Sequence, residues 1–158
     1  MEHPKAKGDR STLAIMLALT EAGFSVYLPF GENTRCDLII DDGDRPRRVQ
    51  CKTGRLRTGA VRFNTCSNYA HHPNPKLLRR DYHGQVDDFA VYCPETERVY
   101  LVPIADLPVV TEGALRVRPA RNGQRRRIRQ AAEYEVDRVA IGLRREPGGP
   151  SGAGGSSA

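Results

Sequence analysis

The sequence predicts an α/β domain, in which one mixed β-sheet is flanked by helices. Three observations predict it: an apolar pattern of helical spacing near the N-terminus, several short strand-type segments joined by turn residues, and a second strand pair after a loop-rich segment. This order fits neither a helical bundle nor an all-β sandwich. We expect one domain with a real core over residues 1–145 and a disordered Gly/Ser/Pro-rich tail over residues 146–158.

The first predicted element is a helix that Ser11 caps and Gly23 ends. Its apolar residues recur near helical spacing, and they are Leu13, Ile15, Met16, Leu17 and Leu19. A strand over Phe24–Phe30 follows, with Pro29 near its end.

The next predicted element is a β-hairpin with strands at Leu38–Ile40 and Val49–Thr53. The letters DDGD after the first strand are turn formers. Because side chains alternate between faces along a strand, Gln50 and Lys52 point to the same side. The hairpin therefore has a polar face where a core face is expected.

Three further strands are predicted, at Val61–Cys66, Phe89–Cys93 and Val99–Pro103. The stretch SNYAHHPNPK after the first of them contains two prolines and predicts a loop. The letters PETE form a turn between the other two strands, and Ile104–Leu107 predicts a brief helical turn.

The charge balance favours an anionic partner. The chain has 25 Lys and Arg against 19 Asp and Glu, a formal net charge of +6, which suits nucleic acid better than a membrane surface. No apolar run approaches the roughly 18 residues of a membrane span, and MEHPKAKGDR lacks the apolar segment of a secretion signal. We expect a cytoplasmic protein without a membrane partner, whose four scattered cysteines are reduced thiols rather than zinc ligands.

The polar face of the hairpin suits a metal site. Asp37 lies at the start of the first strand, where its carboxylate can meet the Gln50 oxygen and the Lys52 ammonium at one edge of the sheet. Mg²⁺ takes hard oxygen ligands and leaves positions for a substrate phosphate, and a lysine there would orient a water or help its deprotonation. The spacing alone also allows an alternative without catalysis, in which Asp37 merely begins a strand and Gln50 and Lys52 lie on a solvated face.

The segments CDLIIDD and RRVQCKTG resemble the signature of the PD-(D/E)XK nucleases. They resemble more closely the branch associated with group I intron homing endonucleases, in which glutamine replaces the second acidic residue. Three blocks carry the resemblance in order over most of residues 7–136: KGDRSTLAIMLALTEAGFSVYLPFGENTRCDLII, DDFAVYCPETERVYLVPI and RPARNGQRRRIRQAAEYE. The resemblance implies a restriction-endonuclease-like fold for residues 1–145.

The resemblance also implies roles for individual residues. Asp37 would bind the metal, Gln50 would be its neutral oxygen ligand and Lys52 the catalytic lysine, with Mg²⁺, or also Mn²⁺, as cofactor. The family usually has a glutamate on the first helix, and Thr12 stands at the matching position. Because Asp37 is the one carboxylate at the three family positions, the site should bind Mg²⁺ weakly, and reduced or lost cleavage is an open alternative.

A basic stretch near the C-terminus predicts contacts with nucleic acid. Residues 116–129 contain seven arginines and no acidic residue, and arginines clamp phosphates while Asn and Gln can read base edges. The alternative is a solvated charge run. Including two arginines that follow the hairpin, the residues predicted to bind nucleic acid are Arg55, Arg57, Arg121, Asn122, Gln124, Arg125, Arg126 and Arg127.

These features predict a metal-dependent endonuclease that binds duplex DNA and hydrolyses phosphodiester bonds. Because two active sites are needed to cut both strands, we expect a homodimer or homotetramer. Two alternatives remain open. One is a catalytically weak or inactive module of the same fold that binds DNA or structured RNA, and the other is a nuclease similar to Holliday-junction resolvases.

Overall fold

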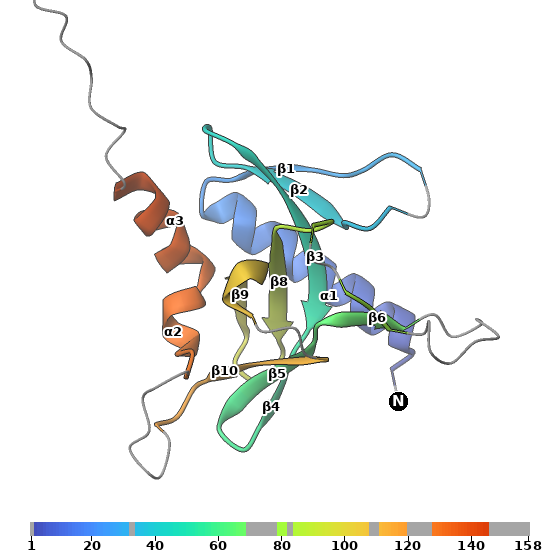
Figure 1. Ribbon diagram of the computed structural model, residues 1–158, viewed down its shortest axis with the longest axis vertical. Helices are drawn as coiled ribbons and strands as arrows, with labels where there is room; N and C mark the ends of the chain where they lie inside the picture. The colour runs from blue at the N-terminus through green and yellow to red at the C-terminus, as the bar shows by residue number, and fades with distance from the viewer. Residues whose placement is uncertain are drawn as a thin grey trace, which may run out of the picture.

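The computed structural model describes residues 2–31, 34–68, 79–81, 84–107, 111–119 and 128–145 of the chain. Figure 1 shows the elements, which are α1 Pro4–Glu21, β1 Ser25–Tyr27, β2 Leu38–Asp41, β3 Pro46–Thr53, β4 Arg55–Arg57, β5 Ala60–Asn64, β6 Cys66–Asn68, β7 Arg79–Asp81, β8 Asp88–Cys93, β9 Arg98–Pro103, the 3-10 helix η2 Ile104–Asp106, β10 Glu112–Arg116, α2 Ala131–Tyr134 and α3 Val136–Arg145. The predicted tail, residues 146–158, and residues 69–76 of the predicted loop lie outside the described residues. The first two residues of that loop, Ser67 and Asn68, belong to β6 instead.

The main sheet has five strands in the order β1-β2-β3-β8-β9. Its strands pair antiparallel except β3 and β8, which are parallel, so the sheet is mixed as predicted. The predicted hairpin is confirmed, with Leu38 opposite Val49. The strand pair β8–β9 and the helical turn η2 are also confirmed.

Helix α1 covers one face of the main sheet (Figure 1). Ile15 and Leu19 of α1 are fully buried together with Leu38, Ile40 and Val49 of the hairpin. Each such side chain contributes about 1.5–3 kcal/mol through burial. The face of β3 that carries Val49 and Cys51 therefore packs against α1. The face that carries Gln50 and Lys52 is on the opposite side of the sheet.

The predicted start of the first helix is wrong. Helix α1 begins at Pro4, with His3 as N-cap, whose ring accepts a hydrogen bond from the Lys5 amide at 3.3 Å. Proline suits the first helical position because its missing N–H would be unpaired there anyway. Ser11 lies inside the helix, buried against the sheet, where its hydroxyl shares a hydrogen bond with that of Thr53.

A smaller antiparallel sheet, in the order β10-β5-β4, lies over the opposite face of the main sheet. Its inner residues Val61, Phe63 and Leu115 share a buried cluster with Phe89 of β8, and the rings of Phe63 and Phe89 have centroids 6.0 Å apart. Strands β4 and β10 were not predicted.

Two predicted strands have different bounds. The segment Val61–Cys66 forms the end of β5 and the start of β6, which are separate strands on either side of Thr65. The segment Phe24–Phe30 contains only the short strand β1.

Gly54 connects the two sheets. Its amide donates to the Tyr92 carbonyl at 2.7 Å, and the chain then leaves β3 and enters β4. A Cβ at this position would lie 2.8 Å from Cγ1 of Val61 and 2.9 Å from Cγ1 of Val91. Only glycine therefore allows the chain to pass between these two side chains without displacing them.

A buried ion pair connects β3 to the start of β8. Arg47 donates from Nε to Asp88 Oδ2 at 2.7 Å and from Nη2 to Asp88 Oδ1, and Asp88 is 0% exposed. Burial raises the pKa of Asp88, and the guanidinium of Arg47 counteracts that rise. The neighbouring pair, Arg48 with Asp87, is much more exposed.

The two C-terminal helices pack beside β9 (Figure 1). Val136 and Ala140 of α3 are buried with residues of α1 and the main sheet, whereas Ala131 of α2 belongs to the cluster on the other face. The hydroxyl of Tyr134 donates to Asp106 Oδ2 at 2.9 Å. Within the described ranges, no helix has both the length and the apolar character that crossing a membrane requires.

Candidate active site

Asp37 is fixed at the start of β2 by the neighbouring strand. Its amide donates to the Val49 carbonyl at 2.9 Å, and its Oδ2 accepts a hydrogen bond from the Cys51 amide at 2.9 Å. Because Leu38 pairs with Val49, the register places Asp37 beside Gln50. The predicted meeting of the carboxylate with the second strand of the hairpin is therefore present.

Gln50 and Lys52 lie on the face of β3 that looks away from α1. Nζ of Lys52 lies 5.9 Å from the centroid of the Phe89 ring, on the side of the smaller sheet. Oε1 of Gln50 is buried and has no hydrogen-bond partner among the described residues. A buried amide oxygen without a donor costs free energy, so this atom is suited to receive a cation or a ligand donor.

Burial shifts both ionisable groups of the site toward their neutral forms. It raises the pKa of Asp37, and the Cys51 amide and the charge of Lys52 partly oppose this rise. It lowers the pKa of Lys52, and the charge of Asp37 opposes this fall while that of Arg35 adds to it. Lys52 therefore loses its proton more readily than an ordinary lysine, as a group that assists deprotonation must.

The oxygen atoms of the site fit Mg²⁺. The carboxylate of Asp37 and the orphaned amide oxygen of Gln50 are hard donors, and Mg²⁺ is often held by one or two carboxylates together with substrate phosphates. Within the part of the chain that is described, no three His, Cys, Asp or Glu side chains gather into a metal-binding group. Of the three site residues, Asp37 alone carries negative charge, because Gln50 is neutral and Lys52 is basic.

Thr12 approaches β3 from the helix side. Its hydroxyl donates to the Gly8 carbonyl at 3.1 Å and lies close enough to the thiol of Cys51, the residue between Gln50 and Lys52, to lower the pKa of that thiol. Burial is the main cause that raises the pKa of this thiol to about 12, so Cys51 is not a nucleophile. The structure thus brings Asp37, Gln50 and Lys52 together and places Thr12 behind them, against Cys51.

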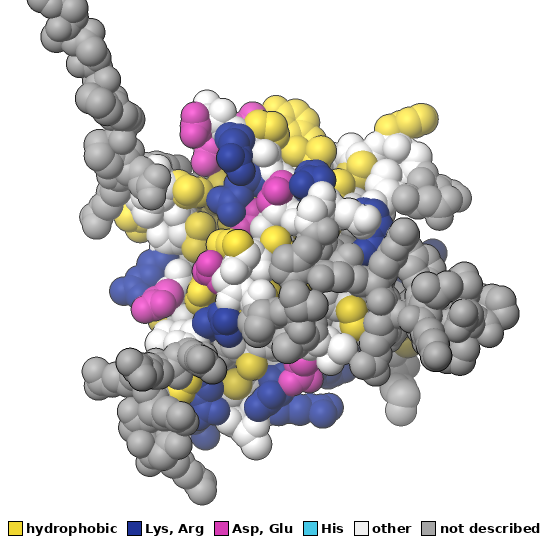
Figure 2. All heavy atoms as spheres, viewed as in Figure 1, with side chains coloured by type: hydrophobic (Ala, Val, Ile, Leu, Met, Phe, Trp, Pro, Cys, Tyr) yellow, Lys and Arg dark blue, Asp and Glu magenta, His cyan; other side chains and the backbone are white. Residues whose placement is uncertain are grey.

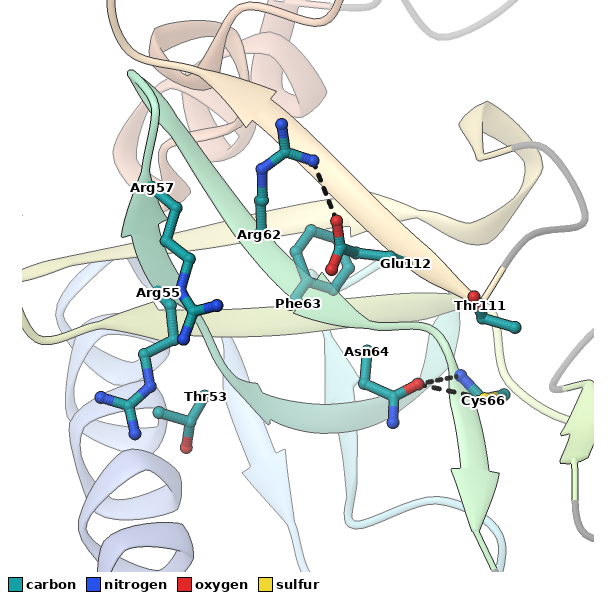
Figure 3. Close-up of a pocket in the computed structure, with 9 residues that line it drawn as sticks. All are labelled: Thr53, Arg55, Arg57, Arg62, Phe63, Asn64, Cys66, Thr111 and Glu112. Atoms are coloured by element: carbon teal, nitrogen blue, oxygen red, sulfur yellow. Dashed lines mark hydrogen bonds and ion pairs between the residues drawn. The ribbon is translucent and has the colours of Figure 1, made fainter.

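A basic pocket of about 400 Å³ adjoins this group (Figure 3). Arg55 and Arg57, both predicted to bind nucleic acid, line it together with Arg62, which the sequence analysis missed. Strand pairing could have indicated Arg62, because it lies directly opposite Arg55. Figure 2 shows Lys and Arg side chains gathered at the β4–β5 end of the molecule.

The pocket and Lys52 are close neighbours. Thr53, the next residue in the chain, lines the pocket, and so does Cys66, whose thiol lies close enough to Lys52 to influence its pKa. The arginines of the pocket therefore begin shortly after Lys52 along the chain.

The other predicted nucleic-acid contacts, Arg121, Asn122, Gln124, Arg125, Arg126 and Arg127, lie outside the described residues. Two arginines at the ends of the same run bind backbone carbonyls. Arg116 donates from Nη1 to Thr58 at 3.1 Å, and Arg129 donates from Nε to Asp106 at 2.6 Å. These two side chains help to hold the small sheet and η2 in place.

Comparison with known proteins agrees with the fold. The bacterial homing endonuclease I-Ssp6803I has a similar structure, with a TM-score of 0.70 and 22% sequence identity, over 93% of this chain and 100% of that chain. At this identity the likeness shows the fold, which is restriction-endonuclease-like. No curated protein matches the chain. Residues 2–137 match the PD-(D/E)XK endonuclease family, so the chain belongs to that family.

Proposed function

We propose that the protein is a homing-endonuclease-like DNA endonuclease that hydrolyses phosphodiester bonds with Mg²⁺. The observation that carries this proposal is the buried, orphaned oxygen of Gln50 beside the carboxylate of Asp37 and on the same strand face as Lys52. Membership of an endonuclease family supports a nucleic-acid substrate.

Each of the three residues has a distinct role in this proposal. Asp37 and Gln50 hold the cation, which supplies positive charge that stabilises the charge developing on the phosphoryl and leaving oxygens. Lys52 orients the attacking water and assists the loss of its proton, for which its lowered pKa suits it. Mn²⁺, which also takes oxygen ligands, can replace Mg²⁺.

The arginines of the basic pocket neutralise the DNA backbone. Arg55, Arg57 and Arg62 lie on one face of adjacent strands, where a phosphate chain can contact them together. The arginines of residues 121–127, which lie outside the described residues, are expected from the sequence to bind DNA as well. The described part of the chain holds one such site, so we propose that cleavage of both strands uses a homodimer or homotetramer.

A cleavage assay tests the proposed function. The purified protein is incubated with supercoiled, linear and branched DNA in Mg²⁺, in Mn²⁺ and in EDTA. We expect nicked and linear products from the supercoiled plasmid in either metal and none in EDTA. Strong preference for branched DNA would favour the resolvase alternative. Binding without cleavage in either metal would favour the non-catalytic module, for which Thr12 and Gln50 provide a reason, since neither supplies negative charge.

A second prediction concerns Thr12. Thr12 lies close enough to Cys51 to influence its pKa, and the Cys51 amide donates to Asp37, so the longer acidic side chain of Thr12→Glu can reach toward that carboxylate. The added negative charge should lower the Mg²⁺ concentration needed for half-maximal nicking by about tenfold or more. In protein without DNA, Mg²⁺ should raise the melting temperature of the variant more than that of the wild type.

Thr20→Glu is the matched control for this prediction. The Thr20 hydroxyl donates to the Met16 carbonyl at 2.8 Å, as Thr12 does to Gly8, but Thr20 is exposed near the other end of α1. The same substitution there should leave the dependence on Mg²⁺ unchanged. If the two variants respond alike to Mg²⁺, position 12 does not face the metal and the alignment of the first helix with the family is wrong.

A further inference from the structure

The β4–β5 hairpin is a short ribbon with a braced tip. Its two-residue turn has positive φ at both positions, 48° at Thr58 and 73° at Gly59, as tight hairpin turns require. The Gly59 carbonyl accepts hydrogen bonds from the amides of Val117 and Arg118 at 2.9 and 3.1 Å, and Arg116 binds the Thr58 carbonyl. The tip is therefore held in one position before any ligand binds.

The two faces of this hairpin have opposite character. Leu56, Val61 and Phe63 pack toward the core, so alternation places Arg55, Arg57 and Arg62 on the outer face. Strand β5 is the middle strand of its sheet and β4 is an edge strand. Arg62 thus lies at the centre of the outer face, and the other two arginines lie at its border.

Arg62 is held by an acidic neighbour on the other side of the hairpin. Its Nη1 donates to Glu112 Oε1 of β10 at 2.9 Å, and the two side chains are 37% and 53% exposed (Figure 3). The residue directly opposite Arg62 on β10 is Ala114, and Ala60 is two positions before it on β5. Ala114 leaves space beside Arg62 on β10, whereas Arg55 lies directly opposite Arg62 on β4. Arg62 and Glu112 both line the basic pocket, which can receive a ligand.

A carboxylate at this place is unfavourable for a surface that binds phosphates alone. Glu112 would repel every phosphate that approaches Arg62, whereas arginines without an acidic neighbour would bind the backbone more tightly. The edges of base pairs differ from phosphates in this respect, because they present donors as well as acceptors in the major groove. Arginine matches the two acceptors of guanine, and glutamate accepts from the amino group of cytosine.

We propose that the β4–β5 hairpin lies in the major groove of duplex DNA, where the Arg62–Glu112 pair reads base edges and Arg55 and Arg57 contact phosphates. The inference rests on the proposed DNA-binding function and adds a specificity-determining pair to it. The groove is about 12 Å wide and accepts a two-stranded ribbon, whose strands are about 4.8 Å apart. Strand β10, which supplies Glu112, pairs with the inner strand β5 as the third strand of this sheet. In this arrangement Arg62, at the centre of the outer face, points to the base edges at the floor of the groove. The edge strand β4 lies beside the phosphates at the side of the groove.

The test selects binding sites from a library of DNA duplexes with randomised positions, in EDTA so that no cleavage occurs. The wild type is compared with Arg62→Gln, Glu112→Gln and Arg57→Gln. All three side chains are at least partly exposed, and glutamine keeps much of their length. We expect the wild type to enrich a motif. Arg62→Gln and Glu112→Gln should both lose preference at the same one or two base pairs, by roughly 5- to 150-fold, and keep the preferences elsewhere.

Arg57→Gln is the contrasting variant. It should weaken binding to all sequences alike and reduce the slope of log affinity against log salt by about 0.9, the loss of one phosphate contact. Melting temperatures close to the wild-type value in all three variants would show that changes in preference do not come from misfolding.

Three results would overturn the inference. Uniform weakening by Arg62→Gln, as by Arg57→Gln, would make the arginines a phosphate clamp. If the wild type binds duplex DNA but enriches no motif, the pair does not read bases, although the proposed function still holds. A wild type that binds no duplex DNA even at low salt would contradict both.

Discussion

Replacing Asp37 with asparagine is expected to reduce DNA cleavage by at least about 100-fold while duplex binding stays close to the wild-type affinity. The substitution removes the carboxylate that the strand register places beside Gln50. An asparagine oxygen can still accept the hydrogen bond from the Cys51 amide, so the hairpin should fold normally. Single-turnover cleavage and equilibrium binding, measured on the same duplex, separate the two effects.

Asp41→Asn is the control for the loss of charge. Asp41 ends the same strand, β2, and its Oδ1 accepts from the Gly43 amide at 2.7 Å, a bond that an asparagine oxygen can also make. This variant should cleave like the wild type. If Asp37→Asn cleaves as fast as Asp41→Asn, in a protein that does cut DNA, then Asp37 does not hold the metal.

Lys52→Met tests the proposed catalytic lysine in the same cleavage and binding assays. Methionine keeps an unbranched apolar side chain over the Phe89 ring but removes the ammonium group, so cleavage should fall by roughly 10²- to 10⁴-fold with little change in folding. Unchanged cleavage would assign Lys52 to the packing of the two sheets rather than to catalysis.

The largest effect on stability is expected from Arg47→Met. The substitution leaves Asp88 buried without its guanidinium partner, which should lower the free energy of unfolding by about 3–5 kcal/mol. For a domain of this size the melting temperature should fall by roughly 6–20 °C. Thermal and urea denaturation measure both quantities.

The deficit of Arg47→Met should depend on pH. Burial already raises the pKa of Asp88, and the loss of Arg47 removes the charge that opposes this rise. A carboxyl group with a raised pKa in the folded state loses stability as pH increases through that pKa, so the deficit should be largest near neutral pH and smaller in acid. A deficit that grows on acidification would contradict this account.

Two further variants control the measurement on Arg47. Arg48→Met removes an exposed ion pair from the adjacent position and should change stability very little. Adding Asp88→Asn to Arg47→Met removes the buried charge and should recover part of the lost stability. Equal effects of Arg47→Met and Arg48→Met would show that the burial of Asp88 is not what makes the first pair important.

The hairpin and its polar face could be predicted from the sequence because both depend on local pattern. Leu38–Ile40 and the turn residues after it define the first strand, and alternation alone puts Gln50 and Lys52 on one side. The orphaned state of the Gln50 oxygen depends on the parallel pairing of β3 with β8, which brings Phe89 beside it. That pairing joins residues far apart in the sequence, and no local signal specifies it.

The start of the first helix and strand β10 were predicted wrongly because serine and arginine can each serve two different structural roles. Ser11 has the chemistry of a helix cap, but its hydroxyl is used inside the helix against Thr53, while Pro4 and His3 begin the helix. Strand β10 was missed because its last residue, Arg116, was counted with the basic run. An arginine that binds backbone carbonyls and one that binds phosphates look the same in a sequence.

The passage of the chain through Gly54 fixes the separation between Lys52 and the β4–β5 hairpin. Thr53 and Gly54 alone separate Lys52 from Arg55, and Val61 and Val91 leave no space for a side chain at this link. In an enzyme that reads DNA with the β4–β5 hairpin and cuts it at Lys52, the number of base pairs between the recognised sequence and the broken bond is therefore built into the backbone. Substitutions on the outer face of the hairpin would give the enzyme new target sequences with the same offset. Moving the cut would instead require a change in chain length at the glycine.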